Sequence, residues 1–349
     1  FSIIEDNHIH HINNMMELGG AEIAGIKMHA AIDVIMRRNH IHHCTMGIWC
    51  DWEAQGTRLS QNLLHDNQRP AFAKQLKGGM MCQDIFVEVG HGPTLIDNNI
   101  LLSDVSLRFA TQGVAMVHNL ICGALTCVGE GTGWRYTPYH MPHRTEVMGF
   151  MTILHGDDRF YNNIFVQKWP SEDFITMHDS DDGFDSENRR VGTWMFDEYP
   201  TYDEWISQFD FTKPADMKKL EPVHFDHLPM WSEGNVYLNG AKEWKHEKDG
   251  FVSSENAKVE LTEKDGKYIL DTNIYEILGD FSDRMINTEI LGKAFEPEEF
   301  FENPDGTPIR FDSDYFGGHR GAKVIPGPFA EKEEIGKNVN MSTCALNKL

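Results

Sequence analysis

The stretch SQNLLHDN at residues 60–67 is repeated in outline by DNNILLSD at residues 97–104 and by VHNLICGA at residues 117–124. Each stretch has an asparagine followed, two positions on, by an apolar residue. The same pattern elsewhere extends the series to Asn7, Asn39, Asn62, Asn99, Asn119 and Asn163. This recurrence predicts a chain built from repeated structural turns.

The intervals between these asparagines are 32, 23, 37, 20 and 44 residues. Intervals of 20 and 23 are typical of one turn, and 44 is close to two turns. The interval of 37 becomes an ordinary 23 if 14 residues are inserted, and residues 69–83 have the Pro, Gly and Lys content of such a loop.

Short segments with β-branched residues, such as DIFVEV at 84–89, lie between the asparagines. Turns of this length cannot bury an apolar face alone, but stacked turns can. The register of leucine-rich repeats and the 3.6-residue period of helical repeats are both missing. The sequence therefore predicts an all-β fold, a right-handed parallel β-helix. The asparagines suit its corners, where a left-handed backbone and an amide ladder can form.

We expect this solenoid to span residues 1–290, with insertions at about 69–83 and 168–230, followed by an irregular C-terminal extension at 291–349. The second insertion is acidic and aromatic, with short helices expected near 202–209 and 216–220. A hairpin is expected around Asp265 and Gly266. Because the chain opens without methionine, we interpret it as the later part of a longer protein.

The net charge of −23 disfavours nucleic acid and anionic membranes as partners. No apolar run approaches the roughly 20 residues of a membrane helix. The six cysteines form no CxxC pair, so we expect free thiols and, from them, a cytoplasmic location. The composition leaves open whether the chain forms a homo-oligomer, and we expect no cofactor.

Two acids occupy matching positions in this pattern. Asp51 and Glu88 are 37 residues apart, and each lies 11 residues before its own corner asparagine, Asn62 or Asn99. Parallel strands lie about 4.8 Å apart, so the two carboxyl groups should be roughly 5 Å apart. That separation is typical of a retaining glycosidase, and one acid should then hold a proton while the other is ionised.

Stacked acids can equally be solvated surface residues above core aromatics. The shared register and the nearby residues argue against that interpretation. Trp49, Trp52 and Phe86 offer faces on which sugars stack, and Arg58 and His91 are close in sequence. We therefore include Trp52, Arg58 and His91 among the candidate substrate-binding residues.

The sequence contains 18 histidines, including HIHH at 8–11 and at 40–43. Zinc needs three or four converging ligands, whereas residues along a strand alternate between its two faces. We therefore predict stacked corner histidines and no metal. His140 and His143 are candidates for the rim of the pocket.

At these residues the chain resembles the family 120 glycoside hydrolases, β-xylosidases built on a right-handed parallel β-helix. The matching segments are GAEIAGIKMHAAIDV (20–34), GIWCDWEAQGTRLSQNLLHDN (47–67), DIFVEVGHGPTLIDNNILLS (84–103), TPYHMPHRTEV (137–147), DDRFYNNIF (157–165) and LPMWSEGNVYLNGAK (228–242). The family's earlier solenoid turns and β-sandwich domain have no counterpart here, and its members have no insertion between the two acids.

The resemblance implies a double displacement that releases xylose from the non-reducing ends of xylo-oligosaccharides. Asp51 would be the nucleophile and Glu88 the general acid/base, and Glu22 and His29 would bind sugar hydroxyls. In strict register Met28 lies under Asp51, so His29 would face the other way unless a bulge turns it.

Two other functions compete with this one. A β-helix polysaccharide lyase or uronan hydrolase would need a cationic groove, which the acidic composition does not suggest. A carbohydrate-binding or inactive β-helix fragment would use the same acids only as hydrogen-bond partners.

Overall fold

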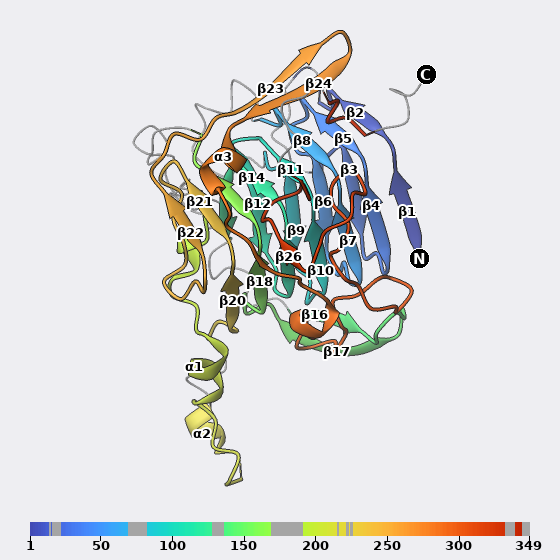
Figure 1. The fold of residues 1–349 in the computed structure, drawn as a ribbon. Coiled ribbons are helices and arrows are strands. Elements are labelled where there is room, and N and C mark those ends of the chain that lie inside the picture. The colour runs from blue at the N-terminus through green and yellow to red at the C-terminus, as the bar shows by residue number, and fades with distance from the viewer. Residues whose placement is uncertain are drawn as a thin grey trace.

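The computed structural model describes residues 1–13, 15, 22–68, 82–127, 136–168, 191–214, 216–220, 223, 226–331 and 339–343. Most of the expected insertion at 69–83, and residues 169–190 of the one expected at 168–230, lie outside these ranges. The described chain forms three long sheets of parallel strands, which run side by side along a stack of turns (Figure 1). This arrangement confirms the parallel β-helix.

Sheet A has seven strands, which in spatial order are β1 (Ser2–Glu5), β4 (Val34–Arg37), β7 (Thr57–Ser60), β10 (Thr94–Asp97), β13 (Val114–Val117), β18 (Asp158–Tyr161) and β20 (Met230–Glu233). Sheet B has eight, β2 (His8–His10), β5 (His40–His42), β8 (Leu63–His65), β11 (Ile100–Leu101), β14 (Leu120–Ile121), β19 (Ile164–Val166), β21 (Val236–Leu238) and β22 (Phe251–Ser253). Sheet C has five, β3 (Ile26–His29), β6 (Ile48–Asp51), β9 (Ile85–Glu88), β12 (Val105–Ala110) and β15 (Ala124–Cys127).

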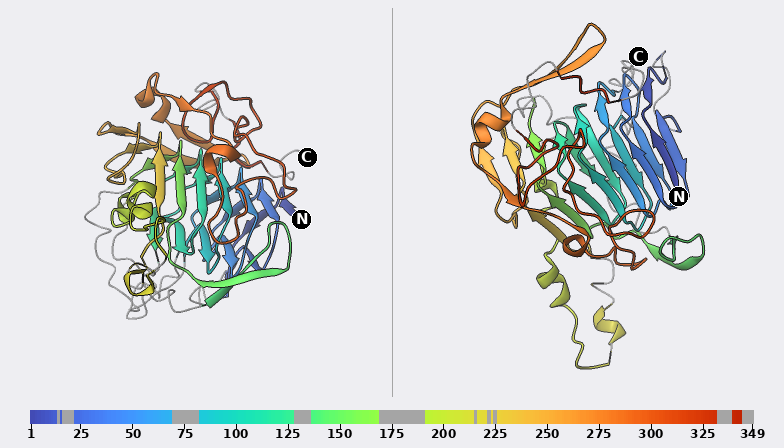
Figure 2. Two further views of the ribbon diagram at one scale, coloured as in Figure 1. Left: turned by 90° about the horizontal axis from the view of Figure 1, so that it is seen from below. Right: turned by 45° about the vertical axis from the view of Figure 1, so that its right-hand side comes forward.

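The remaining elements lie outside the three long sheets. They are the hairpin strands β16 (Tyr136–His140) and β17 (Val147–Thr152), the 3-10 turn Trp194–Phe196, helices α1 (Tyr202–Ile206), α2 (Met217–Leu220), α3 (Ile274–Leu278) and α4 (Thr288–Leu291), and strands β23 (Val259–Lys264), β24 (Lys267–Thr272), β25 (Asp283–Arg284) and β26 (Lys323–Val324). The segment with α1 and α2 projects away from the side of the stack, next to β20 (Figures 1 and 2). Among the described residues, none of the helices has the length and apolar character that a membrane crossing requires.

The interior of the solenoid is filled by rows of equivalent apolar residues. Alternate side chains of each strand point inward, and the row from sheet A includes Met36, Leu59, Ile96, Met116 and Phe160, all fully buried. Each strand is only a few residues long, so its inward residues are stabilised mainly by the turns above and below. The five described cysteines, Cys44, Cys50, Cys82, Cys122 and Cys127, are free thiols, as predicted.

The corner asparagines form the predicted ladder. The side-chain amide of Asn62 donates to Oδ1 of Asn99 at 3.0 Å, and that of Asn99 donates to Asn119 at 3.0 Å. The ladder begins at Asn7, and beyond Asn163 it continues to Asn235, where Glu247 accepts the last amide. Burial raises the pKa of Glu247 to about 7. The left-handed residue is the one before each asparagine, namely Asp6, Arg38, Gln61, Asn98, His118 and Asn162.

We expect Asn99→Ala to lower the free energy of unfolding by about 3 kcal/mol, measured by urea unfolding. Asn99 accepts bonds from the backbone and side chain of Asn62, and it donates to Leu59 and Asn119. The substitution therefore leaves several buried polar groups without partners. The matched control is Asn7→Ala at the exposed end of the ladder, which should cost less than about 1 kcal/mol. Equal losses at the two sites would show that the buried amides do not stabilise the stack.

The 44-residue interval is one turn, so the prediction of two turns was wrong. Strand β13 pairs directly with β18, and the amide of Asn119 donates to Asn163. The additional length includes the antiparallel hairpin β16–β17, which leaves the stack and returns to it. The hairpin expected around Asp265 and Gly266 is present as β23–β24, and both turn residues have a positive φ.

The last strand of the three long sheets is β22, which ends at Ser253, and the chain beyond it packs on the outside of the solenoid. The hairpin β23–β24, which we had assigned to the solenoid, lies in this outer layer. One part, with Tyr268, Leu270 and Phe329, covers the outer face of sheet B. Another part, with Phe301 and Phe311, covers the outer face of sheet A. Figure 2 shows this orange and red segment running along the stack.

Candidate active site

Sheet C presents the candidate acids on its outer face. In β6, Ile48 and Cys50 lie in the solenoid core, and Trp49 and Asp51 alternate with them. Trp49 belongs instead to a small separate cluster with Phe86 of the next turn, and their rings stack at 5.4 Å. The period-two pattern thus sets the tryptophan and the acid on the same face of the strand.

Asp51 and Glu88 occupy equivalent positions on neighbouring strands. Strands β6 and β9 pair in parallel, with Cys50 opposite Val87. One position further, the same register sets Asp51 beside Glu88, as their matching distance from the corner asparagines predicted. Neighbouring strands lie about 4.8 Å apart, so both carboxyl groups project from one short stretch of the sheet.

Each acid has a partner that the sequence reasoning missed. The ammonium of Lys27 lies 2.8 Å from Oδ2 of Asp51 and 3.7 Å from the centre of the Trp49 ring. The indole N–H of Trp49 donates to Oε2 of Glu88 at 3.1 Å. Burial alone would lower the pKa of Lys27, but Asp51 and Glu22 outweigh it and raise the pKa. Lys27 pairs with Trp49 between β3 and β6, a register that the spacing of the asparagines did not predict.

Glu22 and His29 lie beside this group. The Glu22 carboxylate, 77% exposed, forms an ion pair with Lys27. His29 pairs with Asp51 in the sheet, and its ring makes an edge contact with Trp52 at 5.7 Å. Trp52 is 37% exposed and has a positive φ. These three candidates are therefore neighbours of the acids.

The expected position of Met28 under Asp51 was wrong, because Met28 pairs with Cys50. The offset between turns is 22 residues in sheet C, where Met28 pairs with Cys50, and 23 in sheet A, where Met36 pairs with Leu59. The corner after Asp51 holds the additional residue, and both Trp52 and Glu53 adopt the left-handed conformation there. The spacing of the asparagines alone could not show where the offset changes from 22 to 23 residues.

Arg58 and His91 have other surroundings. Arg58 lies on β7 in sheet A, where Nε and Nη2 donate to the Asp97 carboxylate at 2.8 and 2.9 Å and Nη1 donates to Asn303 at 3.2 Å. His91 is only 3% exposed and bonds to the backbone oxygen of Thr137 at 3.1 Å. Burial lowers the pKa of His91 to about 4. The structure thus gives both side chains partners within the protein and does not bring Arg58 to the sheet that carries the acids.

His140, a candidate for the rim, lies near the turn that follows Asp51. Its Nε2 is 3.6 Å from Oε2 of Glu53, and its backbone exchanges hydrogen bonds with the side chain of Gln55. These contacts attach the hairpin β16–β17 to the corner after β6. An imidazole and an acidic group therefore lie at the corner that follows Asp51.

His143, the second rim candidate, joins a polar cluster with Asp33, Glu299 and Glu302. Its Nδ1 is 2.9 Å from Oδ1 of Asp33, and its Nε2 is 3.3 Å from Oε1 of Glu302. Burial opposes protonation of this ring, but these carboxylates together raise its pKa. Burial also raises the pKa of Glu299 to about 7. This cluster ties the hairpin to the C-terminal layer.

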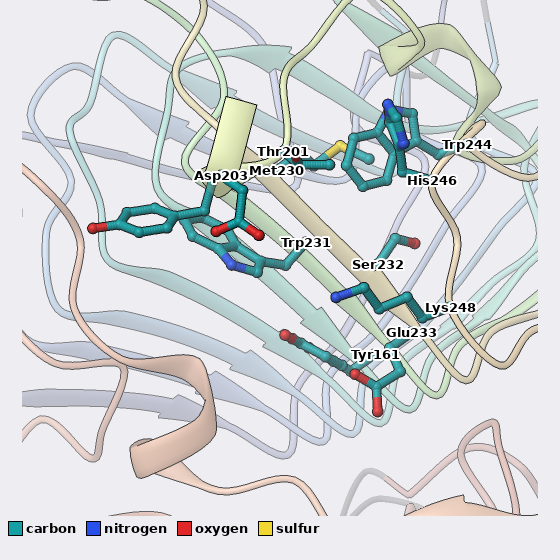
Figure 3. A pocket seen from close by; sticks show the side chains of 11 residues that line it. Tyr161, Thr201, Asp203, Met230, Trp231, Ser232, Glu233, Trp244, His246 and Lys248 are labelled. Carbon is teal, nitrogen blue, oxygen red and sulfur yellow. The ribbon is translucent and has the colours of Figure 1, made fainter. Parts of the chain in front are cut away.

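A separate pocket of about 210 Å³ lies near α1 and β20, and Figure 3 shows Trp231 and Asp203 beside it. Its lining also contains Glu233 and Lys248. An adjoining hollow of about 610 Å³ shares Trp231 with it. None of the acids and substrate ligands predicted from the sequence is among the residues that line either hollow.

No model of a known protein family matches the chain, and no curated protein is similar to it. Among solved structures, the chain is similar to that of XylC in complex with xylose, with 35% sequence identity and a TM-score of 0.79. The similarity covers 95% of this chain and 46% of XylC, so the chain spans about half the length of that relative. The likeness supports a xylosidase-like fold and relates the chain to a protein that binds a sugar.

Proposed function

We propose that the chain carries the catalytic pair of a retaining β-xylosidase of the family 120 type, which releases xylose from the non-reducing ends of xylo-oligosaccharides. The observation that carries this proposal is the equivalent placement of Asp51 and Glu88 on adjacent parallel strands. A pair roughly 5 Å apart leaves no room for the water that an inverting enzyme places between its acids. The similarity to XylC, a protein solved with xylose, supports a neutral sugar as substrate.

In the first step, an oxygen of the Asp51 carboxylate forms a bond to the anomeric carbon as the bond to the leaving oxygen breaks. Glu88 gives its proton to that leaving oxygen. In the second step, Glu88 accepts a proton from water while the water oxygen attacks the anomeric carbon and releases Asp51. Both carboxyl groups then return to their starting states.

The contacts of the two acids suit these roles. The Lys27 ammonium, 2.8 Å from Oδ2 of Asp51, makes a charge-assisted contact that would hold the nucleophilic carboxylate in place. The Trp49 indole fixes the orientation of the Glu88 carboxyl group without supplying a positive charge. Glu22, His29 and Trp52 lie where they could bind the hydroxyl groups and face of the sugar.

The direct test is hydrolysis of an aryl β-xyloside and of xylobiose by the full chain. We expect turnover of both, and proton NMR should find β-xylose before it equilibrates with the α-anomer. Initial α-xylose would contradict retention. Binding of xylobiose without turnover would instead support the carbohydrate-binding function, and unsaturated products from a uronan would support a lyase.

Lys27→Met should lower kcat/KM for the aryl β-xyloside about 10- to 100-fold, because a hydrogen bond to a charged group contributes about 1.5–3 kcal/mol. Methionine keeps much of the length and apolar surface of the side chain but removes the ammonium that contacts Asp51. The matched variant Lys27→Arg keeps the charge and should retain most of the activity. Equal losses in both variants would indicate a packing role for Lys27 instead of an electrostatic one.

A further inference from the structure

Histidines from three successive turns meet on the outer face of sheet B, whereas the acids project from sheet C. In β5, His40 and His42 are two positions apart and therefore share a face, while Ile41 between them lies in the core. His8 pairs with His40, and His42 pairs with His65. We had expected stacked histidines that do not converge. The rings do stack, but the expectation that they do not converge was wrong.

The histidine cluster, defined as His8, His40, His42 and His65, contains two close pairs of Nε2 atoms. The Nε2 atoms of His8 and His42 are 2.8 Å apart, and those of His40 and His65 are also 2.8 Å apart. Ring nitrogens of His8, His40 and His42 all lie within 4.8 Å of one another. Tetrahedral Zn²⁺ has Zn–N distances of about 2.0–2.1 Å, which separates its nitrogen ligands by about 3.4 Å. Shifts of about 1 Å would therefore bring the nitrogens of His8, His40 and His42 to this separation, and His65, whose Nε2 lies beside that of His40, would supply the fourth ligand.

In three of these rings the other nitrogen, Nδ1, also has a partner. Nδ1 of His65 lies 2.6 Å from the Asp66 carboxylate, and Nδ1 of His40 lies 3.0 Å from the Ser342 hydroxyl. Nδ1 of His42 lies 2.7 Å from Nδ1 of His43. A histidine that binds a metal typically donates its other ring N–H to a partner of this kind. That hydrogen bond fixes the orientation of the ring and its tautomer.

The cluster is shielded from solvent on the side of the C-terminal layer. His40 is fully buried and His42 is 6% exposed, and the Tyr268 ring makes an edge contact with His40 at 4.3 Å. Figure 1 shows β24, which carries Tyr268, near the ends of β2, β5 and β8. Imidazole nitrogens gathered in a protected site suit zinc, copper or nickel, whereas calcium and magnesium require oxygen ligands.

We propose that His8, His40, His42 and His65 form a binding site for a transition metal ion, with Zn²⁺ as the expected occupant. The site would link three turns of the solenoid to each other and, through Ser342, to the C-terminal layer. Its position on sheet B makes it structural, and it is independent of the function proposed for the acids of sheet C.

The test uses the full chain after removal of metal with EDTA. Titration with Co²⁺ should give a saturable visible spectrum of tetrahedral type at one ion per chain, and Zn²⁺ should displace it. Zn²⁺ should also raise the thermal midpoint, whereas Ca²⁺ should leave it unchanged. The absence of saturable Co²⁺ binding in the parent protein would overturn the proposal.

Two substitutions localise the site. His42→Gln removes a central ligand, and His8→Gln removes a ligand at the half-buried rim, where the fold tolerates change more readily. Each should weaken Co²⁺ binding about 100-fold or more, since changes in outer partners alone cost 10- to 100-fold. The matched control is His11→Gln, because Nδ1 of His11 faces His10 outside the cluster. Undiminished binding in either cluster variant that retains its far-UV circular dichroism would place the ion elsewhere and refute the assignment.

Discussion

Asp51→Ala should reduce kcat/KM for an aryl β-xyloside on the order of 10⁴-fold or more, because no other group is then placed to form the covalent intermediate. Asp51 is the acid that contacts Lys27, and it stands beside Glu88 in the register of sheet C. The loss should be similar for good and poor leaving groups, since the nucleophile acts in the first step whatever departs. Initial rates with a series of aryl β-xylosides that differ in their leaving groups measure this dependence.

Azide makes the test of Asp51 more specific. A small anion can enter the space left by the carboxylate and attack the anomeric carbon directly, so Asp51→Ala should form the α-xylosyl azide. Asp104→Ala is the matched control, because Asp104 is an exposed acid of a neighbouring turn and should retain full activity. Full activity in Asp51→Ala would exclude this residue as the nucleophile.

The relation between the two acids could be predicted because it depends only on spacing within a repeat. Asn62 and Asn99 contact each other through their side-chain amides, and this contact fixes the register of two neighbouring turns. Any two residues at the same distance before these asparagines then lie side by side. The exception is a turn that contains an additional residue between that position and its asparagine. No such residue intervenes between the acids and their asparagines, despite the 37-residue interval.

The surroundings of the acids were harder to predict. The additional corner residue near Trp52 changes the register of β3 against β6, and it brings His29 to the level of Asp51. Lys27 acts across turns, so its contact with Asp51 becomes visible only when that register is known. Arg58 is close to Asp51 in sequence, but the corner between them turns the chain into a different sheet.

The contacts of the C-terminal layer were also hard to predict from the sequence. A repeat predicts contacts between successive turns, but the residues that cover the solenoid come from a segment without a repeat. Phe301 and Phe311 pack on sheet A through contacts that span more than half of the chain. Charge, composition and periodicity carry no information about such pairings, so the sequence predicted an irregular extension and not the faces that it covers.

Glu88→Ala should separate the two chemical steps. With xylobiose, whose leaving group needs a proton, kcat/KM should fall about 10²- to 10⁴-fold, as expected for loss of a general acid. With a 2,4-dinitrophenyl β-xyloside the leaving group departs without a proton, so kcat/KM should change less than about 10-fold. The second step still lacks its general base, and rapid mixing should therefore reveal a burst of dinitrophenol followed by a slow steady state.

Azide should then distinguish Glu88 from Asp51 by the stereochemistry of the product. In Glu88→Ala the covalent intermediate still forms on Asp51, so azide attacks from the face normally used by water and gives the β-xylosyl azide at an increased rate. Glu88→Gln provides the comparison of similar size, since its amide can still accept the Trp49 N–H bond but cannot supply the proton. A uniform loss with both substrates, without azide rescue, would assign Glu88 to substrate binding instead of proton transfer. An α-azide from this variant would reverse the two roles and make Glu88 the nucleophile.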